Sequence, residues 1–262
     1  MSSTNASLAY EEHGRGVPLV FLHGFPVDRR MWNSQIAELS GTCRVVAVDL
    51  PGFGQSAKGS VASIEGFADA VYELLNSIDA LPCVLIGWSM GGYTALALAR
   101  KHLNALRGLI LIDTKAEPDS SEQRAGRAKM IELAQTGGAA AIADAMVPKQ
   151  IATGTATTRP ALVQQLRHLM LACDPTTIQH ALAAMRDRRD QTDLLPSIEV
   201  PTLVIVGDSD AITPTATAEA MNRLLPNCRM TIIKGAGHAT PIEQPSQVNR
   251  ALREYLQMLG EA

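Results

Sequence analysis

The chain has 262 residues, of which 46% are hydrophobic, 19% charged and 4% aromatic. This length and composition are typical of a globular protein with a sizeable core and argue against intrinsic disorder. The formal net charge of -3 and the few aromatic residues leave no basic surface or base-stacking platform, so no nucleic-acid or membrane partner is expected. The N-terminal sequence lacks the features of a secretion signal, and no apolar run reaches the roughly 20 residues of a membrane span, so we expect a cytoplasmic protein.

Short apolar runs alternate with helix-patterned stretches along most of the chain. The runs have the continuous hydrophobicity of strands that are buried on both faces. They cover residues 17–22, 45–48, 84–87, 109–112, 202–207 and 230–233, and a further edge strand is expected over 7–12. Helices are expected over residues 31–39, 64–75, 90–100, 215–225 and 245–258. This alternation predicts an α/β fold with a mostly parallel central sheet flanked by helices.

Residues 115–195 interrupt this alternation because they contain no convincing strand. Helical spacing occurs instead over residues 121–136, 138–146, 159–171 and 175–186. We therefore predict an α/β core of residues 1–114 and 196–262, with a four-helix cap of residues 115–195 inserted between strands. A cap inserted there would emerge at the carboxyl edge of the sheet, where open α/β sheets bind ligands. The alternative is that these segments are ordinary outer-layer helices.

The segment GWSMGG, residues 87–92, lies between a predicted buried strand and a predicted helix. A serine that must project above a sheet edge sits on a sharp strand-to-helix turn, and small residues two positions on either side allow the two backbones to approach. The following helix N-terminus adds backbone N–H groups and a partial positive charge. Ser89 is therefore the candidate nucleophile, and the alternative is a simple helix N-cap.

A serine nucleophile needs an adjacent base and an acid that orients that base. His238 lies in a glycine-flanked loop after the last predicted strand, from which it can reach the sheet edge, and is the candidate base. Three aspartates compete as the acid: Asp208 and Asp210 in GDSDAITP, and Asp113 after the strand over residues 109–112. Asp208 can also be explained as a turn-forming residue.

Charge that develops on a substrate carbonyl oxygen requires preorganised hydrogen-bond donors. The candidates are the backbone N–H of Met90, directly after the serine, and that of Phe25 in the segment HGFP. Trp88, Met146 and Met170 are candidate substrate-pocket residues, although methionines often merely fill cores. A negatively charged substrate would need a nearby cation, for which the cap offers Arg124, Arg127, Arg186 and Arg188.

The sequence carries no dinucleotide-binding fingerprint and no cluster with metal-ligand spacing, so neither a cofactor nor a metal is expected. The cysteines are scattered along the chain, and Cys43 and Cys83 lie beside predicted strands. We expect both to be small buried thiols.

The motifs HGFPVDRRMW, DLPGFGQS, GWSMGG, GDSDAITP and GAGHATPIEQP occur in this order, and together they resemble the α/β-hydrolase superfamily across essentially the whole chain. Within it, the sequence is similar to small bacterial carboxylesterases, 3-oxoadipate enol-lactonases and cofactor-free haloperoxidases or perhydrolases. The loop after HG lacks the tryptophan of many haloperoxidases. The resemblance favours Asp210 as the acid, because relatives usually place it after the next-to-last strand; some place it where Asp113 lies.

The resemblance implies a serine hydrolase that cleaves carboxylic esters of short to medium acyl chain through an acyl-enzyme. Its partner would be a small-molecule ester or lactone. The alternatives are an enol-lactonase or C–C bond hydrolase with the same triad, and a ligand receptor that retains the fold but turns over slowly.

Overall fold

The computed structural model describes residues 8–57 and 63–260. The strands of this part form one sheet in the order β1-β3-β2-β4-β5-β6-β7, in which every neighbouring pair is parallel except β1 with β3. The strands are β1 (Tyr10–His13), β2 (Pro18–Leu22), β3 (Arg44–Val48), β4 (Cys83–Trp88), β5 (Leu106–Ile112), β6 (Thr202–Gly207) and β7 (Cys228–Ile233). The predicted mostly parallel sheet is confirmed. The edge strand expected over 7–12 begins at Tyr10, and residue 7 lies outside the described residues.

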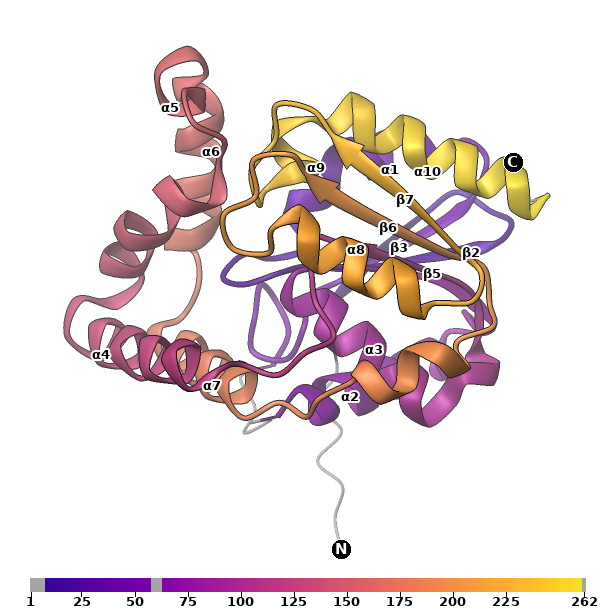
Figure 1. Cartoon of the computed structure of the whole chain (residues 1–262), viewed down its shortest axis with the longest axis horizontal. Helices are drawn as coiled ribbons and strands as arrows, with labels where there is room; N and C mark the ends of the chain where they lie inside the picture. Colours follow the sequence, from indigo (N-terminus) through magenta and orange to yellow (C-terminus); the bar gives the residue numbers. More distant parts are fainter. Residues whose placement is uncertain (1–7, 58–62, 261–262) are drawn as a thin grey trace, which may run out of the picture.

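Helices cover both faces of the sheet (Figure 1). One face carries α2 (Ile64–Ser77), α3 (Met90–His102) and α8 (Thr215–Leu224), and the other carries α1 (Asn33–Leu39) and α10 (Pro245–Leu259). Shorter helical turns are η1 (Arg29–Trp32), η2 (Leu103–Ala105), η3 (Thr192–Ser197) and α9 (Thr240–Glu243). The helix expected over 31–39 is thus divided into η1 and α1. Within the described residues, no helix combines the length and the apolarity needed to cross a membrane.

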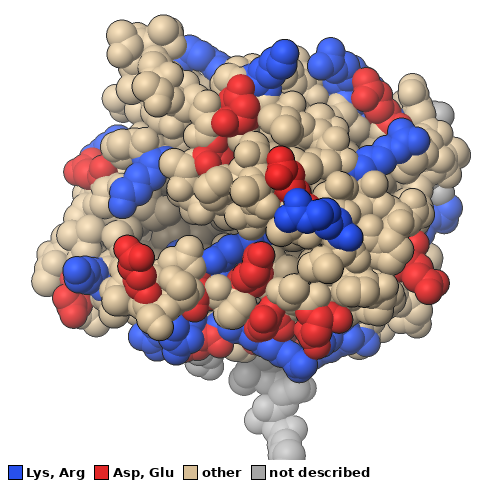
Figure 2. All heavy atoms as spheres, viewed as in Figure 1, with Lys and Arg blue, Asp and Glu red and all other residues tan. Residues whose placement is uncertain are grey.

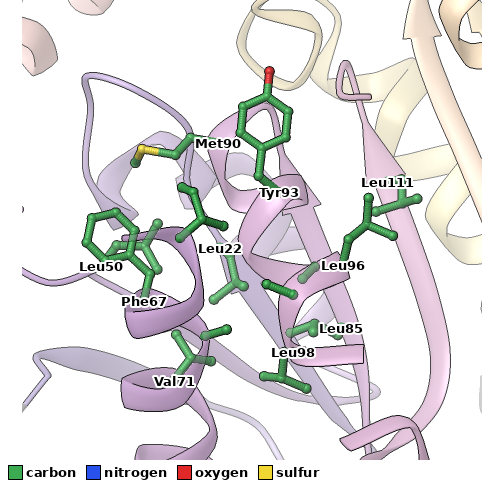
Figure 3. Packing of buried hydrophobic residues seen from close by; sticks show 14 of the residues in the cluster. Leu22, Leu50, Phe67, Val71, Leu85, Met90, Tyr93, Leu96, Leu98 and Leu111 are labelled. Carbon is green, nitrogen blue, oxygen red and sulfur yellow. The ribbon is translucent and has the colours of Figure 1, made fainter. Parts of the chain in front are cut away.

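Successive side chains along each strand point to opposite faces of the sheet and belong to two separate hydrophobic clusters, one on each face. Figure 3 shows the cluster beneath α3, where Leu96 and Leu98 pack toward Leu85 of β4 and α2 contributes Phe67 and Val71. Cys43 and Cys83 are fully buried in these clusters, which confirms their prediction as buried thiols. The sheet that carries the candidate site at its carboxyl edge is therefore packed on both faces.

A helical insertion connects β5 to β6 and lies at the end of the sheet toward which the strand arrows point (Figure 1). It contains α4 (Ser121–Gln150), α5 (Thr155–Thr158), α6 (Pro160–Leu171) and α7 (Pro175–Arg186), with α4 packed against α6 and α7. The segments expected over 121–136 and 138–146 form one helix with a kink at Gly138, and the short α5 was not expected.

The two connections that join the insertion to the sheet are bonded to each other. The Gln191 N–H donates to the Ala116 carbonyl at 3.0 Å. The buried Arg188 guanidinium lies 4.1 Å from the Tyr93 ring centroid and donates to the Asp119 carboxylate at 2.7 Å. Burial raises the pKa of Asp119, but nearby Arg127 and Arg188 outweigh this effect and hold the pKa below its usual value. Asp119 is therefore ionised at neutral pH and fixes the base of the insertion.

Candidate active site

Ser89 occupies the turn between β4 and α3 with φ 51° and ψ -114°, a conformation that is uncommon outside glycine. A Cβ atom at Gly87 would lie 2.4 Å from the Gly91 carbonyl oxygen, and one at Gly91 would lie 2.2 Å from the carbonyl oxygen of Leu22. Both distances are far below van der Waals contact. The small residues two positions before and after Ser89 are therefore what allows strand, turn and helix to pack this closely.

Ser89, His238 and Asp210 form a continuous chain of hydrogen bonds. His238 Nε2 lies 2.8 Å from Ser89 Oγ, and its Nδ1 lies 2.8 Å from Asp210 Oδ2. Because an ionised carboxylate can accept but not donate, Nδ1 carries the proton and Nε2 accepts the serine hydroxyl hydrogen. The three residues come from the ends of β4, β6 and β7, so the sheet order brings them together. Ser89 retains 8% exposure.

Asp210 is held by its own loop as well as by His238. Its Oδ1 accepts from the N–H groups of Ile212 and Thr213 at 2.7 and 3.0 Å, and its Oδ2 accepts from the Thr213 hydroxyl at 2.6 Å. Burial raises the pKa of the carboxyl, but the positive charge that His238 carries when protonated and the hydrogen bonds from His238 and Thr213 outweigh burial. The pKa therefore lies below its usual value, and the carboxylate form is favoured.

The other two candidate acids have different surroundings. Asp113 is buried at the end of β5, where its Oδ1 accepts from the Gly207 N–H at 2.9 Å. Burial, with a contribution from the charge of Asp210, raises the pKa of Asp113 well above its usual value and favours the neutral acid. Asp208 is exposed and accepts from the Gly235 N–H at 3.0 Å, a loop-forming contact. Within the described part of the chain, neither carboxyl forms a hydrogen bond with His238.

The loop that carries His238 is fixed through its backbone. The Trp88 indole N–H donates to the His238 carbonyl at 2.7 Å, and the Thr240 hydroxyl donates to the Gly237 carbonyl at 2.8 Å. Trp88 is fully buried, so its indole connects the elbow after β4 to the loop after β7. This contact has no signature in the sequence, because it joins residues 150 positions apart.

The loop after β2 lies next to the elbow because β2 and β4 are neighbours, with Leu22 opposite Gly87. A Cβ at Gly24 would lie 2.4 Å from the Trp88 ring, so the loop approaches the elbow as closely as glycine allows. This places the Phe25 backbone at the same sheet edge as Met90, the first residue of α3. His23 braces the loop from below, since its Nδ1 lies 2.8 Å from the Gly24 carbonyl oxygen.

The predicted pocket residues differ in accessibility. Trp88 and Met170 are fully buried, whereas Met146 of α4 is partly exposed. Figure 2 shows a hollow on this face between the helical insertion and the core, with charges of both signs scattered around it. The role of these three residues in substrate binding stays a prediction.

The four candidate arginines of the insertion are all engaged by neighbouring groups. Their acceptors are two aspartates and nearby backbone carbonyls. Arg124 and Arg186 donate to Asp187, and Arg127 and Arg188 donate to Asp119. These pairs leave the arginines partly neutralised, which weakens the case for a negatively charged substrate. Among the described residues, no three His, Cys, Asp or Glu side chains are grouped to hold a metal ion.

The chain belongs to the alpha/beta hydrolase family, whose model matches residues 19–251. This finding, with the sheet described above, confirms the predicted fold class and identifies the chain as an enzyme of that hydrolase family.

Within this family, the chain is similar to one curated protein and to two proteins of solved structure. It is 30% identical over 243 residues to the pimeloyl-(acyl-carrier protein) methyl ester esterase of Neisseria meningitidis serogroup C, a match that covers 90% of this chain and 92% of that protein. A thermophilic esterase from Thermogutta terrifontis matches with TM-score 0.92 and 42% identity over 96% of this chain and 93% of that one. The enol-lactonase from Burkholderia xenovorans LB400 matches with TM-score 0.88 and 26% identity over 95% and 96%.

Proposed function

We propose that the protein is a carboxylesterase that hydrolyses small esters of short to medium acyl chain through a covalent acyl-enzyme. The observation that carries the proposal is the chain of 2.8 Å hydrogen bonds from Ser89 through His238 to Asp210. This arrangement matches the roles of nucleophile, general base and orienting acid in acyl transfer.

In the proposed first step, Ser89 Oγ attacks the ester carbonyl carbon while His238 Nε2 takes the hydroxyl proton. The backbone N–H groups of Phe25 and Met90 stabilise the oxyanion of the tetrahedral intermediate. The C–O bond to the alcohol then breaks, and His238 returns the proton to the departing alcohol. Water repeats these steps on the acyl-enzyme and releases the acid, while Asp210 stabilises the imidazolium each time it forms.

One observation supports an ester as the substrate, and a second favours an ester without a negative charge. The solved structure at 42% identity and the curated relative are both esterases by name. The insertion arginines that would attract a carboxylate already bind Asp119 and Asp187. Lactone hydrolysis is the second candidate, since the match to the enol-lactonase covers nearly the whole chain and a lactone is a cyclic ester.

The test is steady-state hydrolysis of p-nitrophenyl esters from acetate to octanoate by wild type, Ser89→Ala and the surface control Ser77→Ala. We expect turnover that falls beyond a limiting chain length in wild type and Ser77→Ala. Ser89→Ala should lose several orders of magnitude in kcat, because the residual rate comes from binding and oxyanion stabilisation alone. A fluorophosphonate probe should add one adduct to wild type, located at Ser89 by peptide mass spectrometry.

The other outcomes separate the alternatives. Turnover of a lactone panel without turnover of the open-chain esters would identify a lactonase. A probe adduct at Ser89 with neither activity would point to C–C bond cleavage or to a ligand receptor. Equal esterase activity in wild type and Ser89→Ala would overturn the nucleophile assignment.

A further inference from the structure

Gln150, the last residue of α4, contacts both loops that border Ser89. Its side-chain Nε2 donates to the carbonyl oxygen of Phe25 at 3.1 Å, and its backbone carbonyl accepts from the Ala239 N–H at 2.7 Å. Gln150 is fully buried, and its Oε1 accepts no hydrogen bond from the described residues. Through these two hydrogen bonds, one residue of the insertion connects the loop of Phe25 with the loop of His238.

Glu243, in α9, makes the second connection. Its fully buried carboxylate accepts from the Gly237 N–H at 2.6 Å, from the Ala152 N–H at 3.0 Å and from the Thr155 hydroxyl at 2.6 Å. Gly237 directly precedes His238, whereas Ala152 and Thr155 belong to the α4–α5 segment of the insertion. The carboxylate is therefore the common acceptor for the insertion and the loop that carries His238.

The backbone of the loop that carries His238 lies very close to the backbone of the insertion at the end of α4. A Cβ at Gly237 would lie 2.5 Å from the Ile151 carbonyl carbon and 2.6 Å from the Ala152 nitrogen. The segment from Gln150 to Thr155 thus lies directly against the histidine loop, with no side chain between them. Any displacement of this segment must move the loop or break its hydrogen bonds.

We propose that Gln150 and Glu243 are positioning residues through which the end of α4 braces the Phe25 loop and the His238 loop against each other. The inference rests on the proposed function, because that function assigns an oxyanion donor to one loop and the base to the other. Gln150 holds the Phe25 peptide, and Glu243 sets the backbone position from which the His238 ring reaches Ser89 and Asp210. The insertion is then part of the catalytic framework as well as a cover over it.

The first test is Gln150→Met, which keeps the length of the side chain but removes the donor to Phe25. We expect kcat for p-nitrophenyl butyrate to fall about tenfold with KM within about twofold, because a group that acts on the transition state changes kcat and not ground-state binding. The control is Gln164→Met on the exposed side of α6, which should leave both constants unchanged. An unchanged kcat, or a raised KM with kcat retained, would overturn the role of Gln150.

The second test compares Glu243→Met, Glu243→Gln and Thr155→Val. Glu243→Met removes the acceptor for the Gly237 N–H and should lower kcat at least tenfold. Glu243→Gln should recover most of that loss, since an amide oxygen in the place of Oε2 can accept from the N–H groups of Gly237 and Ala152 while its NH₂ donates to the Thr155 hydroxyl. Thr155→Val removes one bond on the insertion side and keeps the Gly237 contact, so kcat should stay within about threefold of wild type.

A purely structural role would give a different pattern. In that case, the melting temperature of each of the three variants would fall with the number of hydrogen bonds that it loses. The kcat of the folded protein would not change. The ¹H NMR signal of the His238 Nδ1 proton provides a readout that does not depend on esterase activity. It should match wild type in Glu243→Gln and Thr155→Val but shift or disappear in folded Glu243→Met.

These measurements distinguish a failure of the proposed esterase function from a failure of the proposed positioning role of Gln150 and Glu243. If wild type hydrolyses no ester, the proposed function fails, and the NMR comparison still decides whether Glu243 positions His238. If wild type is active and neither Gln150→Met nor Glu243→Met changes kcat, the brace is wrong and the esterase proposal stands. If Glu243→Met does not fold, Gln150→Met and the recovery by Glu243→Gln carry the decision.

Discussion

At the scale of single residues, Asp113 and Asp210 follow neighbouring strands but differ in ionisation. Burial raises the pKa of Asp210, but the charge of protonated His238 and the hydrogen bonds from His238 and Thr213 bring it below its usual value, whereas burial and the charge of Asp210 raise the pKa of Asp113. Two adjacent carboxyls that both ionised would repel each other, so the structure favours one charged and one neutral group. The charged group is the one that contacts His238 Nδ1.

The roles of the aspartates can be tested by three asparagine variants. Asp210→Asn should lower kcat by about 10⁴-fold, because an amide cannot hold the imidazole in the required tautomer. Asp113→Asn should keep kcat within about threefold, since asparagine resembles the neutral acid and can still accept from Gly207. Asp208→Asn, at an exposed position, is the control. A large loss in Asp113→Asn with a small one in Asp210→Asn would reverse the assignment.

Functional residues could be predicted from the sequence where the pattern that marks them lies within a short stretch of chain. Ser89 stands out because glycine spacing, strand and helix all lie within a few residues of it. The acid was harder to assign, because choosing between Asp113 and Asp210 requires the hydrogen bonds around each carboxyl. Gln150 was not found, because its contacts with Phe25 and Ala239 span 125 and about 90 residues and follow no local pattern.

At the scale of secondary-structure elements, α4 contains two glycines with different consequences. Gly138 has φ 61° and ψ -158°, a conformation that is essentially restricted to glycine, and it marks the kink between two helical segments. Gly126 lies within the helix, and a Cβ atom there would meet nothing within 4 Å. One glycine is therefore required by the backbone, and the other merely lowers helix propensity.

Alanine variants at these two positions should have opposite effects on stability. Gly138→Ala should lower the free energy of unfolding by about 1–3 kcal/mol, because alanine disfavours this backbone conformation. Gly126→Ala should raise it by about 0.5–1 kcal/mol through better helix propensity. Urea denaturation followed by circular dichroism measures both. Destabilisation of similar size in the two variants would mean that Gly138 has no special conformational role.

In α4, the position of the kink could be predicted from the sequence, but the end of the helix could not. The break between 121–136 and 138–146 could be predicted, because adjacent glycines interrupt helical spacing there. The expected end at Met146 was wrong: the helix continues through Pro148 to Gln150. Proline is a strong helix-ending signal locally, but the bonds of Gln150 to the core favour one more turn. Tertiary contacts of this kind are not visible in a local window.

At the scale of the whole molecule, the fold could be predicted because a parallel sheet needs strands that are hydrophobic on both faces. The buried runs recur between helices, and right-handed crossovers leave only a few topologies for such an alternation. Contacts between distant segments at the sheet edge were less predictable. His23 is fully buried and contacts the carbonyl of its neighbour Gly24 through Nδ1. Its Nε2 also accepts from the Leu50 N–H at 3.0 Å, a contact that joins residues 27 positions apart and follows no local pattern.

The neutral form of His23 makes the stability of the whole molecule depend on pH. Burial lowers the pKa of His23 below its usual value of 6.5 despite the opposing hydrogen bond to Gly24. The unfolded chain therefore binds a proton near pH 6.5 that the folded chain resists, and protonation would also displace the Leu50 N–H from Nε2. The stability that neutral His23 contributes should thus be complete above about pH 6.5 and be lost as the pH drops from there toward the folded pKa, whereas Asp113, whose pKa is raised, contributes with the opposite sign.

Below pH 6.5, this one proton should contribute a decrease in the free energy of unfolding of up to about 1.4 kcal/mol per pH unit, which is the difference in slope expected between wild type and a variant without His23. His23→Gln, measured by urea denaturation between pH 5 and 8, should be less stable than wild type at pH 8 but should lose most of that slope. His168→Asn, at an exposed position of α6, should retain the wild-type slope. An equal slope in His23→Gln and wild type would show that acid sensitivity arises elsewhere, because removing the buried imidazole removes the difference in proton binding.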